Sequence, residues 1–194
     1  MKKILVVICV FIASYSYAQD LKFGVKSGLN LANVAGSDVE DNKVNTRFYF
    51  GGFLNTPLSD AVSFQPELLI SMQGFEVDMN GEDIDLALNT SYLNIPLLFK
   101  MRLGASNKAH FYAGPQLGFL LKAEEEAKSG SESYTNDIKD EINSVDFSLN
   151  FGLSFNLNEG FALDVRYNRG LTKLVEDGGK AYNSVIQLGA SYSF

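Results

Sequence analysis

Cysteine and tryptophan are nearly missing from this chain of 194 residues, which has one cysteine and no tryptophan. The cysteine, Cys9, lies in the first 18 residues, so the remainder cannot form a disulfide framework. Basic residues are also few, since 16 Lys and Arg stand against 23 Asp and Glu, with a net charge of −7. This balance argues against a nucleic-acid partner, because nucleic-acid binding needs basic patches.

The apolar start of the chain is too short for a membrane anchor, since a spanning helix needs about 20 apolar residues. It shows instead the three parts of a secretory signal: lysines at 2–3, an apolar segment at 4–13 and the small-residue pattern Ser16-Tyr17-Ala18. We therefore expect residues 1–18 to be a signal peptide, cleaved after Ala18. Residues 19–194 are expected to form one exported domain.

The stretch VDFSLNFGLSFNL, residues 145–157, alternates strictly between large apolar and small or polar side chains. Successive side chains of a β-strand point to opposite faces, so this pattern predicts a strand with two different surroundings. At about ten to thirteen residues, such strands are close to the length that a tilted strand needs to cross a bilayer. Seven further runs alternate in the same way: 21–31, 47–54, 62–72, 92–102, 110–122, 161–170 and 185–194.

An even number of long antiparallel strands can close on itself and remove its edges. We expect an all-β fold, an eight-stranded antiparallel up-and-down transmembrane β-barrel. A soluble lipocalin-like barrel would instead turn its apolar face inward around a ligand. Two features favour the membrane barrel. First, the apolar sides of the alternating runs contain no charged residue before Arg169. Second, glycines such as Gly24 and Gly152 lie on the polar sides of the runs, and small residues suit a crowded barrel interior.

The inward face carries the charged side chains, which we expect to neutralise one another as a structural network in a lumen just wide enough for side chains. The predicted network comprises Lys26, Arg47, Glu67, Lys100, Arg102, Gln116, Asp146, Asp164 and Arg166. Lys122 is assigned to the same face. The sole histidine, His110, has no serine or cysteine nucleophile beside it in a recognisable motif. We therefore expect no catalytic residue, no cofactor and no metal site.

Connections between the predicted strands alternate between short and long, and outer-membrane barrels have short periplasmic turns and long external loops. Both ends of the mature chain are therefore expected in the periplasm. The segments assigned to external loops hold 17 Asp and Glu but only four Lys; they are 35–45, 75–90, 123–144 and 174–183. We expect solvated acidic loops, with weak divalent bridging to lipopolysaccharide as an additional hypothesis.

Aromatic residues recur at one level of the predicted barrel. At the periplasmic ends of seven strands we expect an outward girdle at the lipid interface, formed by Phe23, Phe64, Phe99, Phe111, Phe155, Phe161 and Tyr192. A sparser ring at the other end comprises Phe48, Phe119, Phe147 and Tyr167. Pro66, Pro96 and Pro115 lie inside predicted strands and lack a ladder donor, so we expect β-bulges at these positions.

Five stretches of the sequence resemble a known family: LKFGVKSGLNLANV, SFQPELLISMQG, SYLNIPLLFKMRLG, FYAGPQLGFLL and IQLGASYSF. They resemble the PorT-like outer-membrane β-barrel proteins, often labelled porin-family, over nearly all of residues 19–194. The resemblance implies a small barrel in the outer membrane of a Gram-negative bacterium. A last strand ending in Phe194 resembles the signal that the barrel-assembly machinery reads. These motifs specify architecture rather than activity, and the porin label is not evidence of a pore.

These features predict a non-enzymatic integral outer-membrane barrel, a closed wall that displays acidic loops for surface contact or envelope integrity. Its partners would be outer-membrane lipid and, during biogenesis, the barrel-assembly machinery. Three alternatives stay open: a narrow channel for small solutes, a PorT-like accessory subunit of a secretion or envelope assembly, and a soluble periplasmic barrel that binds a ligand.

Overall fold

The computed structural model describes residues 21–36, 42–78, 84–106, 108–129, 132–175 and 179–194. The predicted signal peptide, residues 1–18, lies outside these ranges. In chain order the elements are β1 (Lys22–Ala35), β2 (Asn42–Pro57), β3 (Val62–Asp78), β4 (Ile84–Leu103), β5 (Ala109–Ser129), β6 (Glu132–Asp137), the 3-10 helix η1 (Lys139–Glu141), β7 (Val145–Asn156), β8 (Phe161–Lys173) and β9 (Tyr182–Ser193). No helix of the described ranges is long and apolar enough to cross a membrane.

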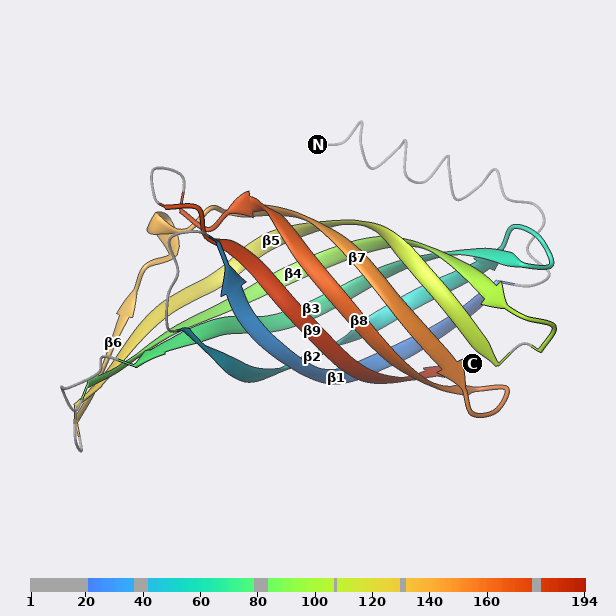
Figure 1. The fold of residues 1–194 in the computed structure, drawn as a ribbon, viewed down its shortest axis with the longest axis horizontal. Coiled ribbons are helices and arrows are strands. Elements are labelled where there is room, and N and C mark those ends of the chain that lie inside the picture. Colours follow the sequence, from blue (N-terminus) through green and yellow to red (C-terminus); the bar gives the residue numbers. More distant parts are fainter. Residues whose placement is uncertain (1–20, 37–41, 79–83, 107, 130–131, 176–178) are drawn as a thin grey trace.

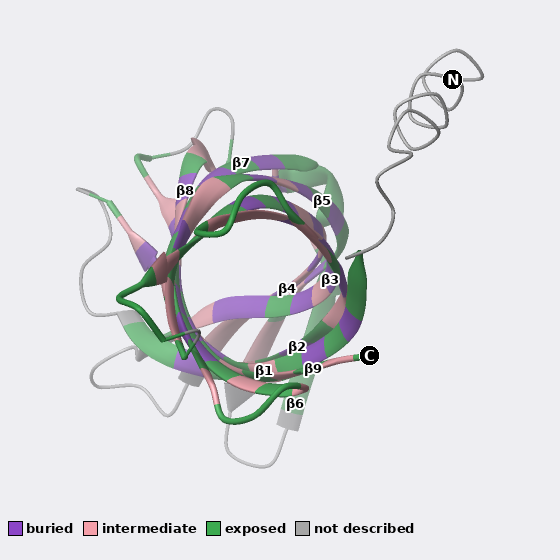
Figure 2. Ribbon diagram, turned by 90° about the vertical axis from the view of Figure 1, so that its right-hand side faces the viewer, coloured by how far each residue is buried: buried purple, intermediate pink, exposed green. Residues whose placement is uncertain are grey.

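Eight of these strands form a closed antiparallel barrel, which Figure 1 shows from the side and Figure 2 along its axis. The strands pair in the order β4-β3-β2-β1-β9-β8-β7-β5, and pairing of β4 with β5 completes the ring. The first and last strands, β1 and β9, are neighbours, with Gly28 opposite Gly189. The predicted eight-stranded barrel is therefore confirmed, and β6 is an additional short strand that pairs with β5 alone among the described strands.

The two ends of the barrel differ in their connections. The β2–β3, β4–β5 and β7–β8 connections, residues 58–61, 104–108 and 157–160, lie at one end with the start of β1 and the end of β9 (Figure 1). We call this the turn end. The opposite ends of the strands lie together with β6 and η1, and we call this the loop end.

Five strands exceed the predicted ten to thirteen residues. β1 has 14 and β2 has 16, and the three longest, β3, β4 and β5, have 17, 20 and 21. Residues 75–78, 84–89 and 124–129, expected as parts of external loops, continue these strands beyond the barrel at the loop end. With β6 they form what we call the projecting sheet, in which Glu76 pairs with Ala87, Ala87 with Glu126, and Glu126 with Thr135. Glu76 and Glu125 are exposed in this sheet, so their charges reach solvent while the backbone groups pair.

The prolines produce gaps in the ladders rather than bulges, so the bulge prediction was wrong. The β2–β3 ladder skips Pro66, the β3–β4 ladder skips Pro96 and the β4–β5 ladder skips Pro115, with an unchanged register on both sides. Each proline therefore costs a ladder hydrogen bond without adding a residue. Register shifts occur elsewhere, between Val44 and Tyr49, between Ser91 and Tyr92, and between Arg169 and Lys173.

The shift at Ser91 and Tyr92 corrects one predicted side-chain direction. Ser91 pairs with Lys122 but Tyr92 pairs with Leu120, so β5 carries an extra residue at this point. The extra residue reverses the alternation. Leu120, before the extra residue, still faces inward and is buried, whereas Lys122, expected to face inward, is exposed and forms a 2.7 Å ion pair with Glu124.

Candidate functional site

Four charged side chains meet inside the barrel, and we call them the central ion cluster: Lys26 of β1, Glu67 of β3, and Asp164 and Arg166 of β8. All four are buried. Both guanidinium Nη atoms of Arg166 lie 2.9 Å from the Glu67 carboxylate oxygens, one to each oxygen. The Lys26 ammonium bridges the two acids, 3.3 Å from Glu67 Oε1 and 3.1 Å from Asp164 Oδ1. Two cations and two anions make the cluster neutral, which is the condition for burying charge at acceptable cost.

Uncharged donors add hydrogen bonds to the cluster. The Tyr112 hydroxyl donates to Asp164 Oδ1 at 3.1 Å, and the Gln65 amide donates to Glu67 Oε1 at 2.7 Å. The guanidinium of Arg166 also lies over the Tyr112 ring, 5.2 Å from its centroid. A bidentate arginine fork, a hydroxyl and an amide therefore hold the carboxylates in place, and such geometry is more rigid than isolated ion pairs.

Buried aromatic rings from two strands, β2 and β5, also lie inside the barrel. Tyr49 lies opposite Gly28 in the β1–β2 ladder, and Phe53 lies opposite Gly24. Tyr112 lies opposite Gly152 in the β5–β7 ladder. A side chain at any of these glycines would meet the facing ring, so each glycine makes room for an aromatic residue.

A second, uncharged network occupies the lumen on the loop-end side of the cluster. Gln187 donates to Asn30 Oδ1 at 2.8 Å, and Asn30 donates to Ser71 Oγ at 2.9 Å. Across the barrel, Asn150 donates to Gln116 at 3.2 Å and Asn168 donates to Asn150 at 3.1 Å. Except for Gln116, these residues were missed because the prediction followed charge, although Asn30, Asn150 and Asn168 stand on the inward side of alternating runs.

The remaining predicted network residues lie apart from the central ion cluster. Arg47 donates to the Asn89 side chain, and Asp146 is buried beside Asn183. Lys100 and Arg102 lie toward the turn end, where they line a cavity. The structure thus divides the predicted single network into a neutral centre and separate peripheral groups.

An apolar cluster bridges the barrel at the loop end, and we call it the loop-end apolar cluster. Its buried members are Val34, Tyr92, Leu120, Ala123, Ile142 and Leu174. The segment after β6 is held over the barrel by backbone bonds from Ile138 N to Ala123 O, 3.1 Å, and from Asn143 N to Leu174 O, 2.8 Å. This cluster was not predicted from the sequence, although isolated apolar residues in an acidic segment, such as Ile142, were a usable signal.

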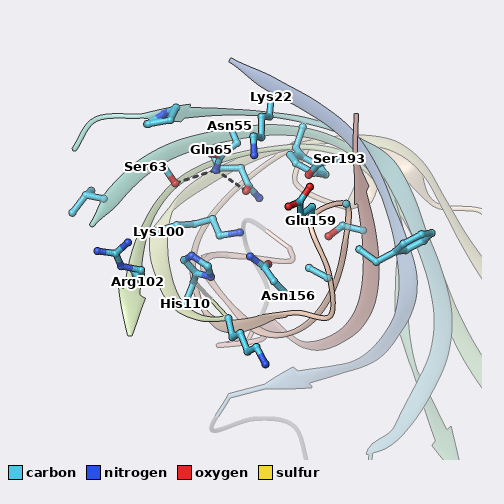
Figure 3. A pocket seen from close by; sticks show the side chains of 18 of the residues that line it. Lys22, Asn55, Ser63, Gln65, Lys100, Arg102, His110, Asn156, Glu159 and Ser193 are labelled. Atoms are coloured by element: carbon cyan, nitrogen blue, oxygen red, sulfur yellow. Dashed lines mark hydrogen bonds between the residues drawn. The ribbon is translucent and has the colours of Figure 1, made fainter. Parts of the chain in front are cut away.

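The turn end is hollow. A cavity of about 980 Å³ lies between the three short connections and the central ion cluster (Figure 3). Its charged lining consists of Lys22, Lys100, Arg102, Lys108, Asp60 and Glu159. His110 lines the same cavity, as expected for an inward residue at the start of β5. Within the described residues, no three His, Cys, Asp or Glu side chains converge in a way that could hold a metal ion.

The sequence matches the family described as "Outer membrane protein beta-barrel domain" over residues 17–176. The chain belongs to this family. No curated protein sequence matches it. Solved structures with the same fold include Ail, the attachment invasion locus protein of Yersinia pestis, at 16% identity and a TM-score of 0.54. Another is Neisserial surface protein A, at 12% identity and a TM-score of 0.54. In both comparisons the alignment covers 91% of this chain and 100% of the other.

Membership of an outer-membrane family explains the outer wall of the barrel, which is apolar over its whole circumference. Leu153, for example, is 56% exposed, whereas its neighbour Ser154 is 6% exposed inside. The predicted girdle residues surround the turn end, and contacting rings join neighbouring strands: Phe64 with Phe99 at 5.2 Å and Phe161 with Tyr192 at 4.7 Å. In a soluble protein such a surface would be an aggregation hazard, whereas here it faces lipid.

Proposed function

We propose that this chain is a closed, non-enzymatic outer-membrane wall whose projecting sheet presents an acidic surface outside the cell. The observation that carries the proposal is the presence of two successive obstructions in the lumen. The central ion cluster crosses the middle of the barrel, and the loop-end apolar cluster bridges the mouth. An ion moving along the axis would have to separate paired charges and then pass an apolar layer.

The orientation in the proposal follows the family pattern of short periplasmic turns and longer external connections. The turn end would then face the periplasm, with Phe194 in the position of the assembly signal. The Phe194 amide donates to Phe23 O at 2.9 Å, and its ring contacts those of Phe23 and Tyr192. The signal peptide, cleaved after Ala18, and the girdle at the lipid interface are part of the same proposal.

The loop end would present acidic groups to the exterior. Glu76 and Glu125 are exposed on the projecting sheet, and Asp140 and Glu141 follow in η1. Their charges suit contact with cationic surfaces or, through divalent ions, with the anionic lipid around the barrel. This supports a role in surface contact or envelope integrity.

Planar-bilayer recording of purified monomer tests the closed wall. We expect no steady open conductance from the natural chain. A variant that weakens both obstructions, Arg166→Ala with Leu174→Ala, should conduct, whereas the control Arg102→Ala, outside both obstructions, should stay silent. Steady conductance from the natural chain would contradict the proposal and favour the narrow-channel alternative.

The second candidate function is an accessory subunit of a secretion or envelope assembly, as the PorT-like resemblance implies. The projecting sheet favours this candidate, because it carries the strand β6 and the exposed Tyr134, 66% accessible, well beyond the barrel. A photo-crosslinking residue at position 134 tests it. A defined adduct in native membranes that is absent with the same residue at lipid-facing position 153 would support the subunit role, and no adduct would remove it.

A further inference from the structure

Lys100 is a half-buried cation of the lumen that lies outside the central ion cluster. The central ion cluster is neutral by itself, with each of its carboxylates already bonded to a cation. Among the described residues Lys100 forms no ion pair, and its Nζ makes one long hydrogen bond, 3.4 Å, to Ser154 Oγ. An ammonium group that is half-buried and unpaired attracts an anion more strongly than an exposed one, because water screens it less.

The surroundings of Lys100 are suited to an oxyanion. Lys100 from β4, His110 from β5 and Asn156 from the end of β7 extend into the same space (Figure 3). Gln65 and Ser63 line the wall from β3. The ammonium, amide and hydroxyl groups of these side chains can donate to carboxylate or phosphate oxygens. The cavity therefore has a cationic centre with neutral donors around it.

We propose that the turn-end cavity binds a carboxylate-bearing ligand, with Lys100 pairing the carboxylate. A single carboxylate carries the charge that neutralises the Lys100 ammonium, and Lys100 lies beside the central ion cluster rather than at the cavity rim. A phosphate ester would bring a charge of about −1.5 to −2, which is more than Lys100 alone neutralises. Asp60 and Glu159 offset part of the charge of Lys22, Arg102 and Lys108, and Lys100 is matched with one carboxylate.

The size of the cavity indicates that the ligand is larger than the carboxylate alone. A volume of about 980 Å³ lies within the range of small-molecule sites. Beyond Lys100 the walls mix polar groups, such as Asn55 and Ser193, with apolar ones, such as Phe53 and Leu157. The carboxylate could belong to a free small molecule or to an acidic side chain of a peptide segment that enters from the turn end. The site is independent of whether the barrel conducts.

Nuclear magnetic resonance titration of the barrel in nanodiscs of phosphatidylcholine tests this site. The probes are glutaramate, which has one carboxylate, its neutral analogue glutaramide, methyl phosphate, and the peptide N-acetyl-Gly-Glu-Gly-amide. Glutaramate should shift the backbone amides of Lys100 and Asn156 saturably, and glutaramide should not. Lys100→Gln should weaken binding about tenfold or more, the loss of a charge-assisted bond. Lys100→Arg should retain binding, as should the control Lys173→Gln at the loop end.

Several outcomes would overturn the proposal: no saturable shift with glutaramate, equal affinity of Lys100→Gln and the natural chain, or tighter binding of methyl phosphate than of glutaramate. Heat-modifiable gel migration checks that each variant is folded. If Lys100→Gln does not fold, the chemical-shift changes that glutaramate causes in the natural chain test the site. Changes confined to the loop end would contradict it. Tighter binding of the peptide than of glutaramate would identify a chain segment as the source, and equal or weaker binding would identify a free carboxylate.

Discussion

Tyr112 of β5 lies directly opposite Gly152 of β7, and its ring occupies the space that a side chain at position 152 would need. The same tyrosine donates its hydroxyl hydrogen to Asp164 in the central ion cluster. The absence of a side chain at position 152 therefore affects the central ion cluster, because the Tyr112 ring occupies that space when its hydroxyl bonds to Asp164. A small residue on the barrel wall sets the position of a buried charge.

Gly152→Ala is therefore predicted to destabilise the barrel by about 1–3 kcal/mol, the usual cost of forcing extra volume into a packed interior. The added methyl group would push the Tyr112 ring away from Asp164. Urea unfolding in detergent measures the change. Gly52→Ala is the matched control, since Gly52 is on β2 and an added Cβ would have its nearest neighbour at 3.5 Å, an ordinary contact. Equal unfolding midpoints for the two variants would refute the argument.

Arg166 and Glu67 are predicted to be strongly coupled. Arg166→Met or Glu67→Leu alone leaves a buried charge without its partner, which costs about 3–5 kcal/mol. The double variant leaves the Lys26–Asp164 pair, 3.1 Å apart and still neutral, so it should be less destabilised than the sum of the two single changes.

A double-mutant cycle of unfolding free energies measures this coupling. Arg102→Met provides the control, because Arg102 lies at the cavity edge and forms no ion pair among the described residues. Its effect should stay within about 0.5 kcal/mol. Strict additivity of the Arg166 and Glu67 changes would show that the fork contributes no specific interaction.

The outward direction of the apolar rows can be measured with tryptophan, because the natural chain has none. Leu153→Trp should be quenched by brominated acyl chains, since Leu153 is on the outer wall. Ser63→Trp, in the turn-end cavity, should respond to a water-soluble quencher but not to brominated lipid. The reverse result would mean that the barrel is inside out.

The orientation of the barrel can be tested with cysteine, because Cys9 is the only one in the sequence and lies in the predicted signal peptide. Lys139→Cys in η1, at the loop end, should react with a membrane-impermeant maleimide in intact cells. Ser106→Cys in the β4–β5 connection should react only after the outer membrane is permeabilised. Labelling of position 106 alone in intact cells would invert the proposed orientation.

Alternation within each run was enough to predict which residues face inward along β7 and β8, because side-chain direction in a strand has a local period of two. It failed at Lys122, where one extra residue in β5 reverses the pattern. At the prolines the expected bulges are absent, and the alternation continues because the ladder loses pairs but not register. Alternation along a strand therefore predicts whether a residue faces inward or outward only as far as the next register shift.

The ends of β3, β4 and β5 were mispredicted because acidic composition resembles that of a solvated loop. The structure shows that residues 84–89 and 124–129 pair across strands, and β6 adds a further partner. Backbone pairing depends on a neighbouring strand, which composition does not reveal. The loop-end apolar cluster was missed for a similar reason, since Val34 and Leu174 meet only when the barrel is closed.

By itself, the sequence determined that this protein is an eight-stranded barrel with an apolar outside and a polar inside, because those properties follow from period, length and charge along each strand. Tertiary structure alone decided which inward charges meet. Lys26 and Asp164 are 138 residues apart in the chain yet form an ion pair, while Arg47, Lys100 and Arg102 lie away from the cluster. The reason is that such contacts depend on closure, on strand register and on the glycines that admit aromatic rings, and none of these is set by a single strand.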